Sequence, residues 1–439
     1  MRATTFLLTA ILCATALPLT ALADPDPAPA PAPAGAEAAP ADADAASAAE
    51  TDPLQHIHSL AELEALGETG NVPAQRKLGA LYANAQFPGY DLARAAEWFR
   101  RAALQGDADA QFSLGVMHEN GQGVGRDLAE ARRWYLLAAA QGSAFAQTNL
   151  GFLYGSGRLG TPDYGQAFRW YLAAAEQGQA LAQANVALFY ALGQGVAQDP
   201  ARALHWYQSA AEQGNPTAQL SVGAAYEKGQ GVERDPARAA WWYFNAAQQG
   251  EALAALNLGV MYRSGQGVKR DPEQARYWLR QAAEAGNALG QFNLAVMQVL
   301  GEGAPADAAQ AATGFRRAAQ QGLPAAEAQL GYAYLTGRGV RRDELAALHW
   351  LRRAASHGDA SALGNLADLA EHGRAGPRDP VLACMLYSAA SLAGQHGALK
   401  ERRRLLAGLD PAQANEANLL FMLWRPGAPL PQRSVTGAR

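Results

Sequence analysis

Cysteine and charge are both scarce in this sequence. Its 439 residues include two cysteines, Cys13 and Cys384, and charged residues make up 17% of the chain. Cys13 lies in a segment that we expect to be removed, so the mature chain cannot form an intrachain disulfide. The formal net charge is −4, and the acids concentrate in residues 24–50, which hold no base. The remainder is close to neutral, so neither nucleic acid nor an anionic membrane is predicted as a partner.

Catalytic and metal-binding motifs are missing. The sequence has no H-E-x-x-H, no G-x-S-x-G and no Walker loop. His56 and His58 are two residues apart, so in a helix they would point to different sides and could not share a metal. The other histidines occupy scattered positions: His118, His205, His349, His357, His372 and His396. We therefore predict a non-enzymatic protein with no catalytic, metal or cofactor site.

The N-terminus has the layout of a cleavable secretory signal over residues 1–23. Arg2 precedes an apolar run from Phe6 to Leu17, and the small-residue triplet Ala21-Leu22-Ala23 follows. The apolar run is too short to span a bilayer. We expect export to the periplasm without a lipid anchor, with secretion or the cell surface as the alternative, and no integral membrane segment. Residues 24–55 are rich in proline, alanine and acids, and are predicted to be a disordered linker.

Glycine recurs every 36 residues along most of the chain. The positions are Gly70, Gly106, Gly142, Gly178, Gly214, Gly250, Gly286, Gly322, Gly358 and Gly394. They delimit nine repeats with no insertion: 71–106, 107–142, 143–178, 179–214, 215–250, 251–286, 287–322, 323–358 and 359–394. A fixed period of this length is typical of a solenoid.

Each repeat reads as helix, loop and helix. The first repeat shows the first-helix pattern, with Ala74, Leu78, Gly79 and Tyr82 making one apolar stripe. Five repeats have a Gly-x-Gly-Val loop, whose glycines suit a helix end and a tight turn. An aspartate follows in all nine, and Asp at the N-cap starts a second helix. Asp127 with Glu130 and Asp163 with Gln166 also have the spacing of a reciprocal capping box.

The second helix carries a large aromatic residue between small ones. An alanine is followed three residues later by tryptophan in seven repeats, and then by an Ala-Ala pair. Large and small side chains would interdigitate between stacked helices. Repeat 359–394 departs from the pattern with Ala370 and Leu386, which its terminal place explains. Cys384 follows a core alanine there and is predicted to be a buried, inert thiol.

Both ends of the repeat array carry predicted capping helices. Residues 56–70 contain an amphipathic helix over 57–69, and residues 395–424 contain two helices, over 398–406 and from Asp410 to near Trp424. Residues 425–439 are predicted to be disordered.

The full pattern is A-x-A-Q-x-x-L-G-x-x-Y-x-x-G-x-G-V-x-x-D-x-x-x-A-x-x-W-Y-x-x-A-A-x-x-G. It resembles the Sel1-like repeat, a relative of the tetratricopeptide repeat, over residues 71–394. The resemblance implies an all-α, right-handed α-solenoid of about nine helix pairs. It further implies an adaptor that binds another protein, here one of the cell envelope. The alternatives are a glycan- or peptidoglycan-related envelope protein, acting in polysaccharide export, ligand binding or hydrolysis, and a secreted effector that binds host proteins.

In related repeat folds the first helices line the concave face, so a partner is expected there. Positions three, six and ten of each repeat would face inward and are often apolar. Alternatively, these side chains complete the packing between repeats. The candidate partner-binding residues are Phe112, Phe145, Phe152, Leu220, Leu256, Phe292 and Tyr332. Gly314 replaces the repeat tryptophan and is a candidate hinge or partner notch, or is simply tolerated.

Overall fold

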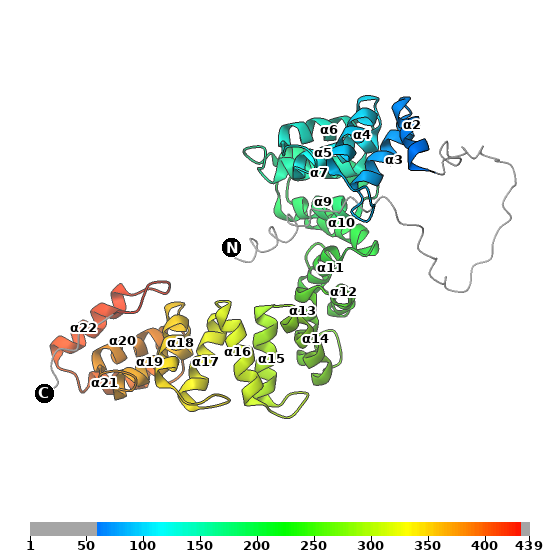
Figure 1. The fold of residues 1–439 in the computed structure, drawn as a ribbon. Coiled ribbons are helices and arrows are strands. Elements are labelled where there is room, and N and C mark those ends of the chain that lie inside the picture. Colours follow the sequence, from blue (N-terminus) through cyan, green and yellow to red (C-terminus); the bar gives the residue numbers. More distant parts are fainter. Residues whose placement is uncertain (1–58, 432–439) are drawn as a thin grey trace. The chain divides into compact units, whose positions relative to one another are not determined.

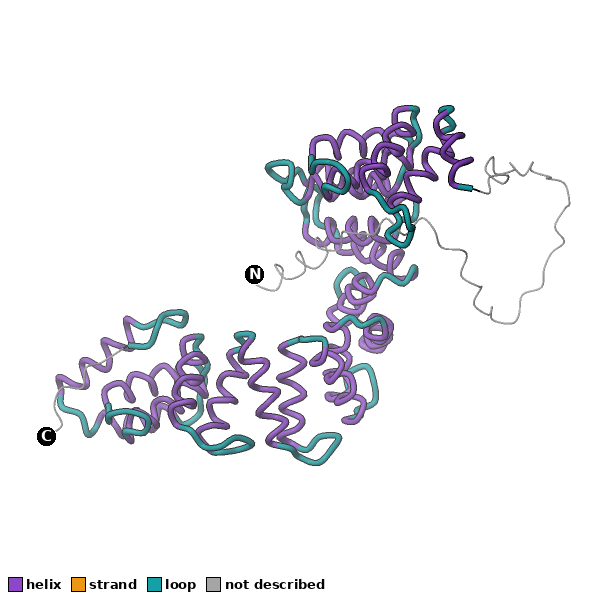
Figure 2. Tube along the Cα trace, viewed as in Figure 1, coloured by secondary structure: helices purple, strands orange, loops and turns teal. Residues whose placement is uncertain are grey.

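The computed structural model describes residues 59–431, and these form 21 helices and no strand (Figures 1 and 2). The described residues form two compact units, one that ends at Ala218 and one that begins at Gln219. The helices are α2 (Leu60–Glu68), α3 (Val72–Ala83), α4 (Leu92–Leu104), α5 (Ala108–Asn120), α6 (Leu128–Ala140), α7 (Ala144–Gly155), α8 (Tyr164–Glu176), α9 (Ala180–Leu192), α10 (Pro200–Glu212), α11 (Pro216–Lys228), α12 (Pro236–Gln248), α13 (Ala252–Ser264), α14 (Pro272–Glu284), α15 (Ala288–Leu300), α16 (Ala308–Gln320), α17 (Pro324–Thr336), α18 (Glu344–Ser356), α19 (Ala360–His372), α20 (Pro380–Leu392), α21 (Ala398–Leu406) and α22 (Pro411–Leu423).

The predicted helical solenoid is confirmed. Consecutive helices pack as pairs, one pair to each 36-residue repeat, and loops alternate regularly with helices along the tube in Figure 2. First helices of 12 or 13 residues are too short to be stable alone in water, so their stability comes from packing against neighbours.

The predicted N-cap role of aspartate is confirmed in all nine repeats. Asp271, for example, accepts hydrogen bonds from the backbone N–H groups of Glu273 and Gln274, both at 3.0 Å. The backbone N–H of the same aspartate donates to a carbonyl near the end of the first helix, Tyr262 O at 2.9 Å. This second bond also recurs in all nine repeats, so one residue closes the loop and starts the next helix.

That second bond explains why the reciprocal capping box expected at Asp127 and Asp163 is not formed. A capping box needs a free N–H on the N-cap residue. The N–H of Asp127 is already bonded to His118 O, and that of Asp163 to Tyr154 O, each at 2.9 Å. The box forms instead at Asp410 with Gln413, in the capping helix α22.

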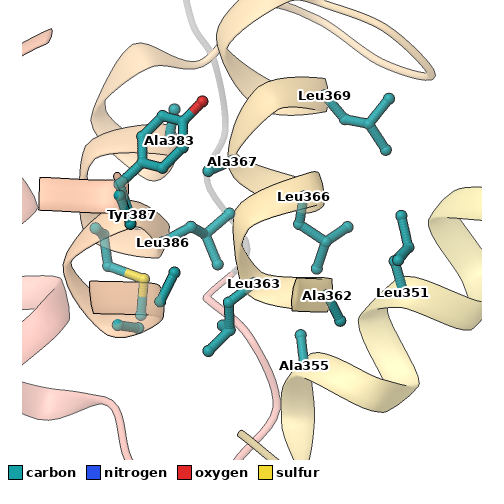
Figure 3. Packing of buried hydrophobic residues seen from close by; sticks show 14 of the residues in the cluster. Leu351, Ala355, Ala362, Leu363, Leu366, Ala367, Leu369, Ala383, Leu386 and Tyr387 are labelled. Carbon is teal, nitrogen blue, oxygen red and sulfur yellow. The ribbon is translucent and has the colours of Figure 1, made fainter. Parts of the chain in front are cut away.

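Small residues allow close contact between the two helices of a repeat. A Cβ added to Gly79 would lie 2.7 Å from the ring of Phe99, and one on Gly115 would lie 2.6 Å from the ring of Tyr135. Glycine therefore receives the large residue of the partner helix. Figure 3 shows the same interleaving in the last repeat, where Ala367 lies opposite Tyr387.

A ladder of hydrogen-bonded glutamines, which the sequence did not predict, links the two helices within each of six repeats. Its first-helix glutamine is buried and also bonds to the preceding second helix. Gln111 donates to Ala103 O of the preceding repeat at 3.1 Å, and Gln141 donates to Gln111 Oε1 at 2.8 Å. The same side-chain pair occurs at Gln105–Gln75, Gln177–Gln147, Gln213–Gln183, Gln249–Gln219 and Gln321–Gln291. A buried amide is costly unless bonded, so the ladder fixes how one repeat sits on the next.

The ends of the array differ from prediction in detail. Helix α2 begins at Leu60, because Ser59 is extended and accepts a hydrogen bond from Glu62 N. Residues 425–431, expected to be disordered, return along α18: Gly427 N donates to Ser356 O at 2.6 Å, and Leu430 packs against the terminal core. The signal over 1–23, the linker over 24–55 and residues 432–439 lie outside the described residues.

Removing one cap tests this architecture. We expect Asp271→Ala to lower the free energy of unfolding by about 1 kcal/mol, because two backbone donors lose their acceptor. Asp271→Asn keeps an acceptor oxygen and should cost much less. Urea denaturation of both variants checks this; equal losses in the two would contradict the capping role.

Candidate protein-interaction surface

In the first unit, the first helices α5 and α7 bring two predicted residues together. The rings of Phe112 and Phe145 have centroids 5.8 Å apart. Phe112 is half-buried and also contacts Tyr135, at 5.9 Å between centroids. Phe145 is 52% exposed, so it extends the apolar surface outward. Phe152 is half-buried beneath the guanidinium of Arg158, 5.6 Å from the ring centroid.

In the second unit, the predicted residues have different environments. Leu220 and Phe292 are half-buried, and Phe292 packs on Phe315 at 5.7 Å between centroids. Tyr332 is exposed, with the guanidinium of Arg338 6.0 Å from its ring. Leu256, predicted to face a partner, is only 5% exposed. It is part of the core and is too buried to contact a partner.

Whether a predicted partner-facing residue is exposed or packed depends on its position within the repeat. Apolar residues at position three are exposed in Phe145, Leu253 and Leu289, while those at position six are half-buried or buried. Position six completes packing, because its side chains lie against the second helix of the same repeat, as in Phe112–Tyr135 and Phe292–Phe315. At position three, Phe145, Leu253 and Leu289 therefore leave apolar side chains exposed, whereas Leu181 is half-buried.

Gly314 has a packing role. It lies within the continuous helix α16, and a Cβ there would be 2.9 Å from Cβ of Ala295 on α15. Ala295 stands where six repeats have glycine, so its methyl group is what a side chain at position 314 would meet. Gly314 therefore allows α15 and α16 to approach each other.

Sequence reasoning missed an aromatic cluster on second helices of the second unit. Trp241, which is 57% exposed, and Tyr277 occupy the same position of consecutive repeats. Phe244 joins the two helices through Trp278, with ring centroids 5.7 Å apart. The sequence did hold a signal for this cluster. The position before the repeat tryptophan is polar in most other repeats but aromatic in these two.

Reactive groups are few among the described residues. No cluster of three or more His, Cys, Asp or Glu residues could hold a metal there. Cys384 is fully buried, and burial raises the pKa of its thiol, which keeps it protonated and unreactive. None of the described helices is both long enough and apolar enough to cross a bilayer.

Comparison with known families matches the Sel1 repeat to nine consecutive segments. These are residues 72–107, 108–143, 144–179, 180–215, 216–251, 252–287, 288–323, 324–359 and 360–395. The chain belongs to the Sel1 repeat family. Sel1 repeat proteins generally act as scaffolds for protein interaction. The fold is typically non-catalytic.

Two solved Sel1 repeat structures resemble the chain along most of its length. One is a protective antigen of uropathogenic Escherichia coli strains, 32% identical over 82% of this chain and 85% of that one, with a TM-score of 0.57. The other is a Sel1 repeat protein from Oxalobacter formigenes, 33% identical over 70% of this chain and 89% of that one, with a TM-score of 0.56. A search of the curated proteins gave no match.

Gly314→Ala distinguishes close packing from a hinge. In an uncrowded helix this change would stabilise the protein by about 1 kcal/mol. Here we expect a loss of about 1–3 kcal/mol, because the new methyl group overlaps Ala295. Gly165→Ala, whose Cβ would lie 3.5 Å from its nearest neighbour, is the control and should be neutral or stabilising. Thermal unfolding measures both, and a stabilised Gly314→Ala would refute the packing role.

Proposed function

We propose that this Sel1 repeat protein is a non-enzymatic adaptor of the bacterial cell envelope that binds another protein through the face of its first helices. The supporting observation is Phe145, an aromatic side chain that is 52% exposed and lies against the half-buried ring of Phe112. A rigid aromatic ring on a helix loses little conformational entropy on binding, which is why such residues dominate interface energetics.

The surface favours a partner that presents apolar side chains on a helix or an extended segment. Leu253 and Leu289 supply the same kind of exposed position in the second unit. Leu253 and Leu289 are one repeat apart, a spacing suited to a partner of regular secondary structure.

The location rests on the N-terminal sequence. Arg2, the apolar run to Leu17 and the Ala21–Ala23 triplet favour export and cleavage, and so a periplasmic adaptor. The secreted or surface-bound alternative has support of its own, since one relative is described as a protective antigen.

One observation favours the glycan-related alternative. Trp241 and Tyr277 are exposed in consecutive repeats, and exposed rings can stack against sugar faces. A glycan-binding function would lie on second helices, and so would be separable from the first-helix face by mutation.

Comparative capture from native envelope extract tests the adaptor function. We expect Phe145→Ser to lose the proteins that the unmodified chain enriches, since truncating an interface aromatic costs about 2 kcal/mol or more. Its melting temperature should change little, because Phe145 is half-exposed. Mass spectrometry identifies the proteins captured.

The matched control is Leu104→Ser, which removes a 70% exposed apolar side chain from a second helix. This variant should keep the captured proteins. Equal capture by both variants, or a large loss of stability in Phe145→Ser, would argue against the first-helix face.

A further inference from the structure

A half-open cavity of about 920 Å³ lies between the last repeat, the preceding helix α18 and the C-terminal segment. Its walls are α18, α19, the loop to α20, the start of α20 and the returning segment 427–431. This size is at the upper end of the range of about 300–1,000 Å³ found for sites that bind small molecules. All of these elements belong to the second unit.

Three of the residues that line this cavity differ from the residue that most other repeats have at the same position. Ala370 stands where six repeats have tyrosine, and Leu386 where seven have tryptophan. Each change replaces an aromatic side chain with a smaller aliphatic one, which leaves space between the helices. Six of the other repeats carry both rings and serve as internal references. Repeat 287–322 also lacks both rings, but it keeps a glycine, Gly303, in the loop.

The third departure is Ala375, where six repeats have glycine. In five of those, an added Cβ would overlap a carbonyl oxygen at the start of the preceding second helix: Gly123, Gly195, Gly267, Gly303 and Gly339. An alanine cannot approach that closely, so this loop must stand away from α18. Ala375 is also the one non-glycine residue with positive φ, 62°, in the described part of the chain.

The lining combines an apolar floor with a cationic rim. The floor consists of Leu366 and Leu369 on α19 and Leu386 on α20 (Figure 3). Arg352, Arg353 and Arg374 surround them, and the one acidic lining residue, Asp379, is buried as the N-cap of α20.

These arginines differ in the charge they can offer. Arg353 pairs with the buried Glu327, at 2.7 Å, and Arg374 pairs with Glu344 and Asp368. Arg352 is exposed and has no hydrogen bond or ion pair among the described residues. Since carboxylates neutralise the other two arginines, Arg352 is the side chain of the rim whose charge is free to bind an anion.

The nature of the walls favours an alkyl chain over a peptide. Pro377, Pro429 and Pro431 have no backbone N–H, and the floor consists of leucine side chains. A bound peptide would need partners for its backbone groups, whereas a hydrocarbon chain needs none. We propose that this cavity binds a single-chain amphiphile with an anionic head, its chain on the leucine floor and its carboxylate or phosphate at Arg352. This proposal is independent of the first-helix face.

Calorimetric titration of the intact chain with dodecanoate, below its micelle concentration, tests the proposal. We expect one site, with binding about fourfold weaker for each methylene removed, as measured with decanoate. Dodecyltrimethylammonium, which has an equal chain and the opposite charge, should bind about tenfold more weakly or not at all. Dodecyl phosphate distinguishes the two head groups: one-site binding of either anion supports the proposal, and binding of neither overturns it.

Ala370→Tyr is the decisive variant, because it restores the residue that six other repeats hold at this position. It should fill the cavity, abolish the dodecanoate site and leave the melting temperature unchanged or higher. Arg352→Gln should weaken dodecanoate about tenfold and leave the cation unaffected.

Leu386→Trp is the second cavity-filling variant, for use if Ala370→Tyr lowers the melting temperature. Unchanged dodecanoate binding in a folded filling variant would place the amphiphile elsewhere and overturn the proposal. Equal binding of anion and cation by the unmodified chain would do the same, because it would remove the role of the arginines.

Discussion

The backbone amide of each N-cap aspartate donates to a carbonyl near the end of the preceding first helix, while its carboxylate accepts from the first amides of the second helix. One residue thus ends the loop, orients the second helix and satisfies donors that helix starts leave unpaired. Pairing of the two helices brings glycine against a ring or leucine. The paired helices then present one apolar face to the next repeat, so stacking depends on this clamp.

The repeat period, the helix pairs and the aspartate caps could be predicted, because each follows from neighbours within 36 residues. The glutamine ladder could not, although its glutamine stands in the pattern. An amide side chain gives no periodic apolar signal, and the Gln111–Gln141 contact is defined only once the two helices of the repeat are packed. The capping box at Asp127 was wrongly predicted because its amide is used by His118, a contact that local spacing does not reveal.

The candidate surfaces were predictable only in part. Sequence placed Phe145 and Leu256 on the same face, but exposure separates them, because burial depends on the neighbouring repeat. Gly314 was interpreted from its own repeat position alone, whereas the residue that a side chain there would meet is Ala295 on the paired helix. The cavity at Ala370 and Leu386 needs residues 427–431 as a wall, a segment expected to be disordered. Recurrent residues build the solenoid, and departures from the pattern indicate where it can bind.

Amide hydrogen exchange at the nine N-cap aspartates tests the clamp most directly. Each of these amides is bonded to a first-helix carbonyl, so each should exchange as slowly as the core helices of its own repeat. The amides of the second loop glycine, such as Gly123 and Gly267, donate no hydrogen bond among the described residues and provide the comparison within the same molecule. Aspartate amides that exchange as fast as freely solvated loop residues would contradict the account, because the helix pairs would then be held without the clamp.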